Sequence, residues 1–172
     1  MKKRYENTDV IKPFQPKVHN HQECISEAIT AAGLLCEKEG LTFTPLRRKV
    51  LELVWSSHGS ITAYELLEGL RETGRKAAPP TVYRALEFLL ENGLIHRIES
   101  LNAYVGCGDP KRRHGGQFLI CQDCKTVAEL DDNAIVRAVI SRADSMGFTV
   151  SQQTVEVVGK CADCAAESEK AL

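Results

Sequence analysis

A chain of 172 residues, 43% of them hydrophobic, can form one or two small domains with a buried core. Its net charge of −1 neither favours nor excludes nucleic acid as a partner, because local charge decides such binding. The chain has no apolar run near the roughly 20 residues of a membrane span and no apolar signal segment behind its basic N-terminus. Seven cysteines in such a chain favour thiols over disulfides, and predict a cytoplasmic protein without a membrane partner.

The first half of the chain is predicted to be helical after a short polar lead. Residues 1–20 are polar, include two prolines and show no periodicity, so they are predicted to form a flexible arm. Apolar residues at helical spacing predict a first helix over residues 21–39. Thr44, followed by a proline, should cap a second helix, and Thr62 with Glu65 should form the capping box of a third.

The fourth predicted helix has side chains suited to reading DNA. Pro79 and Pro80 fix its start, and Gly93 ends it. Its apolar residues lie on one side, and hydroxyl, aromatic and guanidinium groups lie on the other side near the N-terminal end. Such groups contact base edges, thymine methyls and phosphates in recognition helices. The side chains predicted to contact DNA are Thr81, Tyr83 and Arg84, with Tyr64 from the third helix.

Two short alternating segments around Leu101–Asn102 predict a β-hairpin after these helices. Helices that end in a hairpin favour a winged helix-turn-helix over residues 21–107, and the alternative is a helical bundle with an incidental hairpin. A basic cluster, Arg47 to Lys49, opens the second helix. It is either a solvated helix face or a set of phosphate contacts.

Residues 108–116 are polar and glycine-rich, and are predicted to be a hinge before an α/β domain over residues 117–172. Two strands, a helix capped by Asp131 or Asp132, and a closing strand are expected there. The fold class is therefore α+β. The predicted inward face of that helix consists of Ile135, Val139, Ile140, Ala143 and Met146.

Two C-x-x-C pairs give the strongest chemical signal in the chain. Each pair can bind a metal from one tight turn, and a tetrahedral site closed by both pairs would join two distant segments. The alternative is a pair of redox motifs, which usually sit where a strand enters a helix. These pairs are expected between strands or at the end of the chain, which favours structural zinc. The predicted ligands are Cys121, Cys124, Cys161 and Cys164.

A second group of potential ligands is mixed in chemistry. Singly, each member has an ordinary interpretation as a surface residue, a core thiol or a solvated charge. Together, two imidazoles, one thiolate and one carboxylate suit Zn²⁺, whereas Mn²⁺ and Fe²⁺ prefer sites without a thiolate. The predicted regulatory zinc ligands are His96, Cys107, His114 and Glu129.

The segments TPLRRKVLELV, TAYELLEGL and PPTVYRALEFLLENGLIHRIES, with the two C-x-x-C pairs, resemble the ferric-uptake-regulator (Fur) family over roughly residues 22–164. The placement of Cys107 is nearest to the zinc-sensing (Zur) branch of that family. The resemblance implies a metal-activated repressor that forms a homodimer through its C-terminal domain. Many members have a histidine-rich H-H-x-H run before the first C-x-x-C pair, and in this chain His114 is the only histidine of that run. This difference argues against a third metal site and against sensing of iron or peroxide.

These observations predict a zinc-responsive transcriptional repressor with two zinc ions per subunit, one structural and one regulatory. It would bind operator DNA and control zinc uptake genes, with no small-molecule substrate. A family relative that senses iron, manganese, nickel or peroxide is the near alternative. A thiol or metal enzyme is disfavoured because four protein ligands leave no open position for water. A zinc-binding interaction module without DNA activity is the third possibility.

Overall fold

A computed structural model describes residues 10–14, 21–57, 59–74, 78–111 and 114–170, which belong to two compact units. One unit is Gln15–Arg113. The other combines Met1–Phe14 with His114–Leu172, so it is built from two separate stretches of the chain. The boundary after Arg113 falls within the stretch predicted to be a hinge. None of the helices in the described ranges is both long and apolar enough to cross a bilayer.

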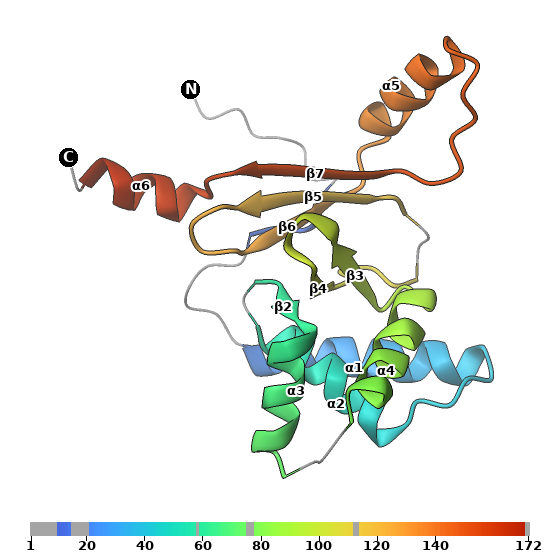
Figure 1. The fold of residues 1–172 in the computed structure, drawn as a ribbon, viewed down its shortest axis with the longest axis vertical. Coiled ribbons are helices and arrows are strands. Elements are labelled where there is room, and N and C mark those ends of the chain that lie inside the picture. The colour runs from blue at the N-terminus through green and yellow to red at the C-terminus, as the bar shows by residue number, and fades with distance from the viewer. Residues whose placement is uncertain (1–9, 15–20, 58, 75–77, 112–113, 171–172) are drawn as a thin grey trace. The chain divides into compact units, whose positions relative to one another are not determined.

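The unit Gln15–Arg113 consists of helices and a small antiparallel sheet, whose first strand lies between the second and third helices in the chain (Figure 1). Its helices are α1 (His21–Lys38), α2 (Pro45–Ser56), α3 (Ala63–Glu72) and α4 (Pro79–Glu91). The strands are β2 (Ile61–Thr62), β3 (Ile95–Ile98) and β4 (Ala103–Gly106), in the order β2-β4-β3, with a 3-10 turn η1 (Glu99–Leu101) between β3 and β4. This is a winged helix-turn-helix arrangement, as predicted.

Local signals in the sequence set the helix starts of this unit. The hydroxyl of Thr44 accepts a hydrogen bond from the Arg47 N–H at the start of α2. Thr62 and Glu65 form a reciprocal capping box at the start of α3, in which the Glu65 carboxylate accepts from the Thr62 N–H at 2.7 Å. Asn102 takes a left-handed φ of 46° in the turn of the hairpin. The predicted caps and hairpin are therefore confirmed.

The second unit is a four-stranded sheet with two helices. Its strands are β1 (Val10–Lys12), β5 (Gly116–Cys121), β6 (Val127–Leu130) and β7 (Thr154–Gly159), in the order β1-β6-β5-β7. β7 runs parallel to β5, and the crossover between β6 and β7 contains α5 (Asn133–Asp144). Asp132 caps α5 by accepting from the Ala134 N–H at 2.7 Å. Helix α6 (Ala162–Lys170) follows β7.

The predicted flexible arm needs a correction at Val10–Lys12. These residues form β1, which pairs antiparallel with β6, with Val10 opposite Leu130 and Lys12 opposite Glu129. Three residues are too few to show a periodicity, and the strand exists only because a distant partner pairs with it. Pro13 and Phe14 follow β1, and residues 1–9 and 15–20 of the predicted arm lie outside the described part of the chain.

The predicted inward face of α5 is also different in the structure. Ala143 is buried, but Val139, Ile140 and Met146 are 41%, 39% and 73% exposed. Figure 1 shows α5 standing away from the sheet of its own unit, so that these side chains have no core of that unit to enter. The amphipathic pattern correctly indicated an apolar face, but a pattern cannot indicate whether the same chain covers that face.

Candidate metal centres and DNA-reading helix

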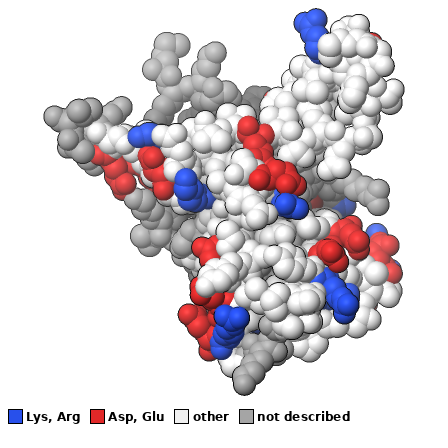
Figure 2. All heavy atoms as spheres, viewed as in Figure 1, with Lys and Arg blue, Asp and Glu red and all other residues white. Residues whose placement is uncertain are grey.

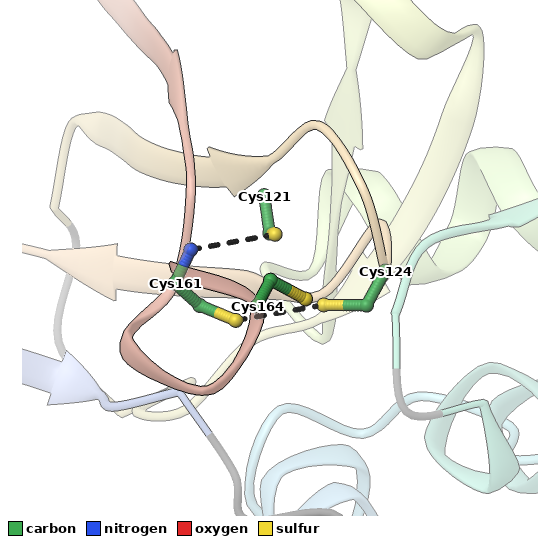
Figure 3. Close-up of side chains that lie close together, drawn as sticks. All are labelled: Cys121, Cys124, Cys161 and Cys164. Carbon is green, nitrogen blue, oxygen red and sulfur yellow. Dashed lines mark hydrogen bonds between the residues drawn. The ribbon is translucent and has the colours of Figure 1, made fainter. Parts of the chain in front are cut away.

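The four thiols of the two C-x-x-C pairs converge on one point (Figure 3). Cys121 ends β5, Cys124 lies in the turn before β6, and Cys161 and Cys164 lie at the start of α6. The ligand atoms of all four lie within 4.8 Å of one another, and the sulfurs of Cys124 and Cys161 are 3.7 Å apart. Tetrahedral zinc with Zn–S bonds near 2.3 Å requires a sulfur–sulfur separation of about 3.8 Å, so the arrangement fits zinc.

Electrostatics in this cluster also favour a cation. Burial raises the pKa of the Cys121 thiol, but hydrogen bonds from backbone N–H groups, including that of Cys161, outweigh burial and lower the pKa to about 6. A hydrogen bond with Cys161 raises the pKa of Cys164 to about 12. The Cys121 thiol therefore ionises readily, whereas the Cys164 thiol stays protonated, because several thiolates in close contact repel one another. A divalent cation removes this conflict by neutralising the thiolates.

The place of the second C-x-x-C pair corrects one argument from the sequence. The pairs were expected between strands or at the end of the chain, yet Cys161 and Cys164 lie where β7 leads into α6. A strand-to-helix entrance is the usual place of a redox pair. The position of the pair therefore does not distinguish structural zinc from a redox motif. The convergence of four sulfurs does distinguish them, in favour of zinc. The alanine-rich segment ADCAAESEK carried a helix signal that sequence reasoning overlooked.

His96 and Cys107 form one ligand pair within the winged-helix unit. His96 lies on β3 opposite Val105, and Cys107 directly follows β4, the antiparallel neighbour of β3. Their ligand atoms lie within 4.8 Å of each other. The Cys107 N–H donates to the carbonyl of Leu94 at 3.1 Å, which continues the pairing of the two strands and fixes the position of the thiol. Cys107 is buried and His96 is half-buried.

His114 and Glu129 form a second ligand pair, within the other unit. Glu129 lies on β6 opposite Phe118 of β5, and His114 precedes β5. A hydrogen bond of 2.6 Å joins the His114 Nε2 atom to the Glu129 Oε1 atom, and both side chains are buried. A buried carboxylate needs a partner of this kind. An imidazole nitrogen and a carboxylate oxygen also suit zinc as ligands.

The predicted DNA-reading side chains are on the surface of their helices. Thr81, Tyr83 and Arg84 are exposed on α4, while Val82 and Ala85 of the same helix are buried. Tyr64 lies in the first turn of α3 and is 66% exposed. These positions leave the four side chains available to a partner.

The basic cluster at the start of α2 is engaged within its own unit. The Arg47 guanidinium lies 3.5 Å from the centre of the Phe88 ring and donates to the carbonyl of Thr42. Lys49 pairs with Glu52 at 2.8 Å. Of the two interpretations, the solvated, internally paired helix face therefore has more support. On the face drawn in Figure 2, acidic and basic side chains are interspersed.

Comparisons with known proteins agree with this geometry. The sequence profile of the Ferric uptake regulator family matches residues 38–158. The zinc uptake regulation protein of Escherichia coli (strain K12) is 39% identical over 139 residues, which are 80% of this chain and 81% of that protein. A solved structure of a zinc uptake regulator complexed with zinc and DNA has a TM-score of 0.78 and 36% identity, and the match covers 88% of this chain and 99% of that one.

A second solved structure, holo XcZur, has a TM-score of 0.75 and 44% identity, with 81% of this chain and 98% of that chain covered. The two structural matches confirm the predicted α+β fold class, with a winged helix before a small α/β domain. The family profile and the Escherichia coli relative confirm the resemblance found in the sequence, including its nearness to the zinc-sensing branch. The chain belongs to the ferric uptake regulator family.

Proposed function

We propose that this chain is a zinc-responsive transcriptional repressor, not an enzyme, which binds operator DNA as a homodimer when its regulatory zinc site is filled. The genes under its control are zinc uptake genes, and it works in the cytoplasm. Its similarity to zinc uptake regulators, one of them complexed with zinc and DNA, supports this function. The observation that carries the choice of metal is the thiol of Cys107 beside His96, because a thiolate ligand disfavours manganese and iron.

Each chain holds two zinc ions in this proposal. The structural ion is bound by Cys121, Cys124, Cys161 and Cys164, and the regulatory ion by His96, Cys107, His114 and Glu129. Zinc, when bound, supplies a divalent charge that neutralises the thiolates and the carboxylate.

Binding of the regulatory ion by ligands from both units would restrict the movement of one unit against the other. His96 and Cys107 belong to the unit that carries α4, whereas His114 and Glu129 belong to the unit with the four-stranded sheet. One ion held by all four would select an arrangement in which the two α4 helices of a dimer match successive major grooves. Because the two binding equilibria are linked, operator DNA should in return raise the affinity of the chain for the regulatory zinc ion.

Exposed apolar side chains support the homodimer. Met146 and Phe148, which follow α5, are 73% and 62% exposed, and Val157 and Val158 on β7 are 51% and 57% exposed. β7 is also an edge of the described sheet, where backbone groups are open to a further strand. Exposed apolar side chains beside an open edge are typical of an interface between copies.

DNA contact is assigned to Tyr64, Thr81, Tyr83 and Arg84. Arg84 can bind a guanine edge or a phosphate, while the hydroxyl and aromatic groups can reach phosphates and thymine methyls. Their exposure on α3 and α4 supports the assignment.

Fluorescence anisotropy on a pseudo-palindromic operator from a zinc uptake gene tests this function. Zn²⁺, Fe²⁺ and Mn²⁺ are titrated at buffered free concentrations, beside Cys107→Ser and the matched control Cys24→Ser, which changes a half-buried thiol on α1. We expect zinc to activate binding at the lowest free concentration, and the Cys107 variant alone to lose that activation. Equal activation of both variants, or stronger activation by iron or manganese, would contradict the proposal.

A further inference from the structure

One aromatic side chain from the N-terminal stretch lies against the cysteine cluster. Phe14 packs on the buried group formed by Cys121, Cys161 and Cys164, and its own side chain is half-buried. Phe14 follows β1 by two residues and belongs to the same compact unit as the cysteines. The sequence between Lys12 and Phe14 is a single residue, Pro13, which ends the strand because proline has no N–H for the ladder.

We propose that Val10–Phe14, which we call the N-terminal strap, shields the structural zinc site and slows the exchange of its metal. The inference rests on the proposed function, because it assumes zinc at the four cysteines. Three of the four cysteines are buried in the cluster against which Phe14 packs, and Cys124 is exposed. Of the four described cysteines, Cys124 is therefore the one most open to an incoming ligand. An apolar shell around a metal controls the access of water and of competing ligands in this way.

The strap has two attachments in its unit. Its backbone pairs with β6 at two positions, Val10 with Leu130 and Lys12 with Glu129, with an irregular register between them. Its other attachment is the contact between the Phe14 ring and the cysteine cluster. A three-residue edge strand is a weak attachment by itself. The ring contact should therefore decide how often the strap lifts from the thiols.

The test measures how fast a colorimetric chelator captures zinc from the full chain. The Cys107→Ser background is used so that structural zinc alone is counted. Phe14→Ala removes the ring, and Phe14→Leu keeps an apolar side chain of similar reach. Phe43→Ala is the matched control, because Phe43 is a half-buried ring in the other unit.

Each variant is loaded with zinc, and its zinc content is measured before the chelator is added. We expect Phe14→Ala to release zinc about tenfold faster than its parent, since it loses part of the free energy that closes the strap. Phe14→Leu and Phe43→Ala should stay near the parental rate. Should Phe14→Ala lose its zinc before the measurement, Phe14→Val carries the test with an intermediate rate expected.

The outcomes separate this inference from the proposed function. A parent that holds no zinc would overturn the structural zinc site itself, and with it the proposed function. A parent that holds one zinc per chain, with Phe14 variants that release it at the parental rate, would overturn the strap alone. Equal acceleration by Phe43→Ala would also overturn the strap, because the effect would then be general destabilisation.

Discussion

A side chain at Gly106 should destabilise the protein, because the indole of Trp55 occupies the space beside this residue. A Cβ atom built on Gly106 would lie 2.2 Å from the Cε2 atom and 2.4 Å from the Nε1 atom of Trp55. Gly106 does not have a left-handed φ, so the conflict is one of space and not of backbone conformation. Trp55 of α2 would have to move, or the end of β4 would, and Cys107 follows that end directly.

The expected loss of stability for Gly106→Ala follows from this overlap. Overpacking a filled site costs about 1–3 kcal/mol, and the lower entropy of the unfolded chain returns about 0.4–1 kcal/mol. With the middle of each range, the free energy of unfolding should therefore fall by about 1.3 kcal/mol. Urea unfolding followed by tryptophan fluorescence measures it directly, since Trp55 is the single tryptophan of the chain. Movement at the end of β4 would carry Cys107 with it, and zinc-activated DNA binding should then need a higher free zinc concentration.

Gly33→Ala is the matched control for this experiment. It makes the same substitution in α1 of the same unit, where, apart from its chain neighbours and the adjacent backbone of α1, no atom lies within 4 Å of the added Cβ. Alanine inside a helix should stabilise the unit by about 0.5–1 kcal/mol. The two variants should therefore shift the urea midpoint in opposite directions. Equal midpoints would refute the reasoning from the Trp55 contact.

Three further results are expected. Arg84→Ala should weaken specific operator binding by about 10- to 100-fold with both metal loads intact, measured by anisotropy and zinc analysis; unchanged affinity would remove Arg84 from the DNA interface. Glu65→Ala should lower the free energy of unfolding by about 1 kcal/mol at neutral pH. Hydrogen bonds from Thr62 lower the pKa of Glu65 below its ordinary value of 4.5, so this contribution should disappear as the pH falls through that lowered pKa; a pH-independent difference in urea unfolding would contradict it. Phe148→Asp should shift the protein toward monomer in sedimentation without loss of structural zinc, and a persistent dimer would show that this surface is not the interface.

The features that sequence reasoning predicted well are those fixed by nearby residues. The hydroxyl of Thr44 caps α2, and the reciprocal bonds of Thr62 and Glu65 cap α3, within a span of three residues in each case. The C-x-x-C spacing is equally local, since Cys121 and Cys124 face each other across one tight turn. In that turn the Lys125 N–H donates to the carbonyl of Cys121 at 3.0 Å.

The features that it missed depend on distant partners. β2 has two residues and β1 has three, and each is a strand only because β4 or β6 pairs with it. The buried amide of Gln117 was likewise overlooked as a structural element. It donates to the carbonyl of Asp132 and accepts from the Asp132 N–H, both at 3.0 Å, and so joins β5 to the start of α5. A glutamine carries no sequence signal for such a contact.

The candidate metal ligands also differ in whether nearby residues or distant partners determine their positions. The sequence placed His114 in the polar connector and Glu129 after the first C-x-x-C pair, and predicted both as ligands without any contact between them. The pairing of β5 with β6 brings them into a hydrogen bond. The exposed apolar face of α5 had a clear pattern, but the described part of its own unit leaves Val139 and Ile140 exposed.

The position of β1 makes the winged helix an insertion within the other unit. The chain leaves the sheet after β1, builds the whole of the winged helix, and returns to the same sheet at β5. During synthesis β1 is therefore made first but stays without its partner until β6 at Val127–Leu130 has emerged. The winged helix, which is continuous in sequence, can fold in the interval. A single cut between the units would leave β1 on the fragment that carries the winged helix, so the two halves could not be prepared as complete domains by dividing the chain once.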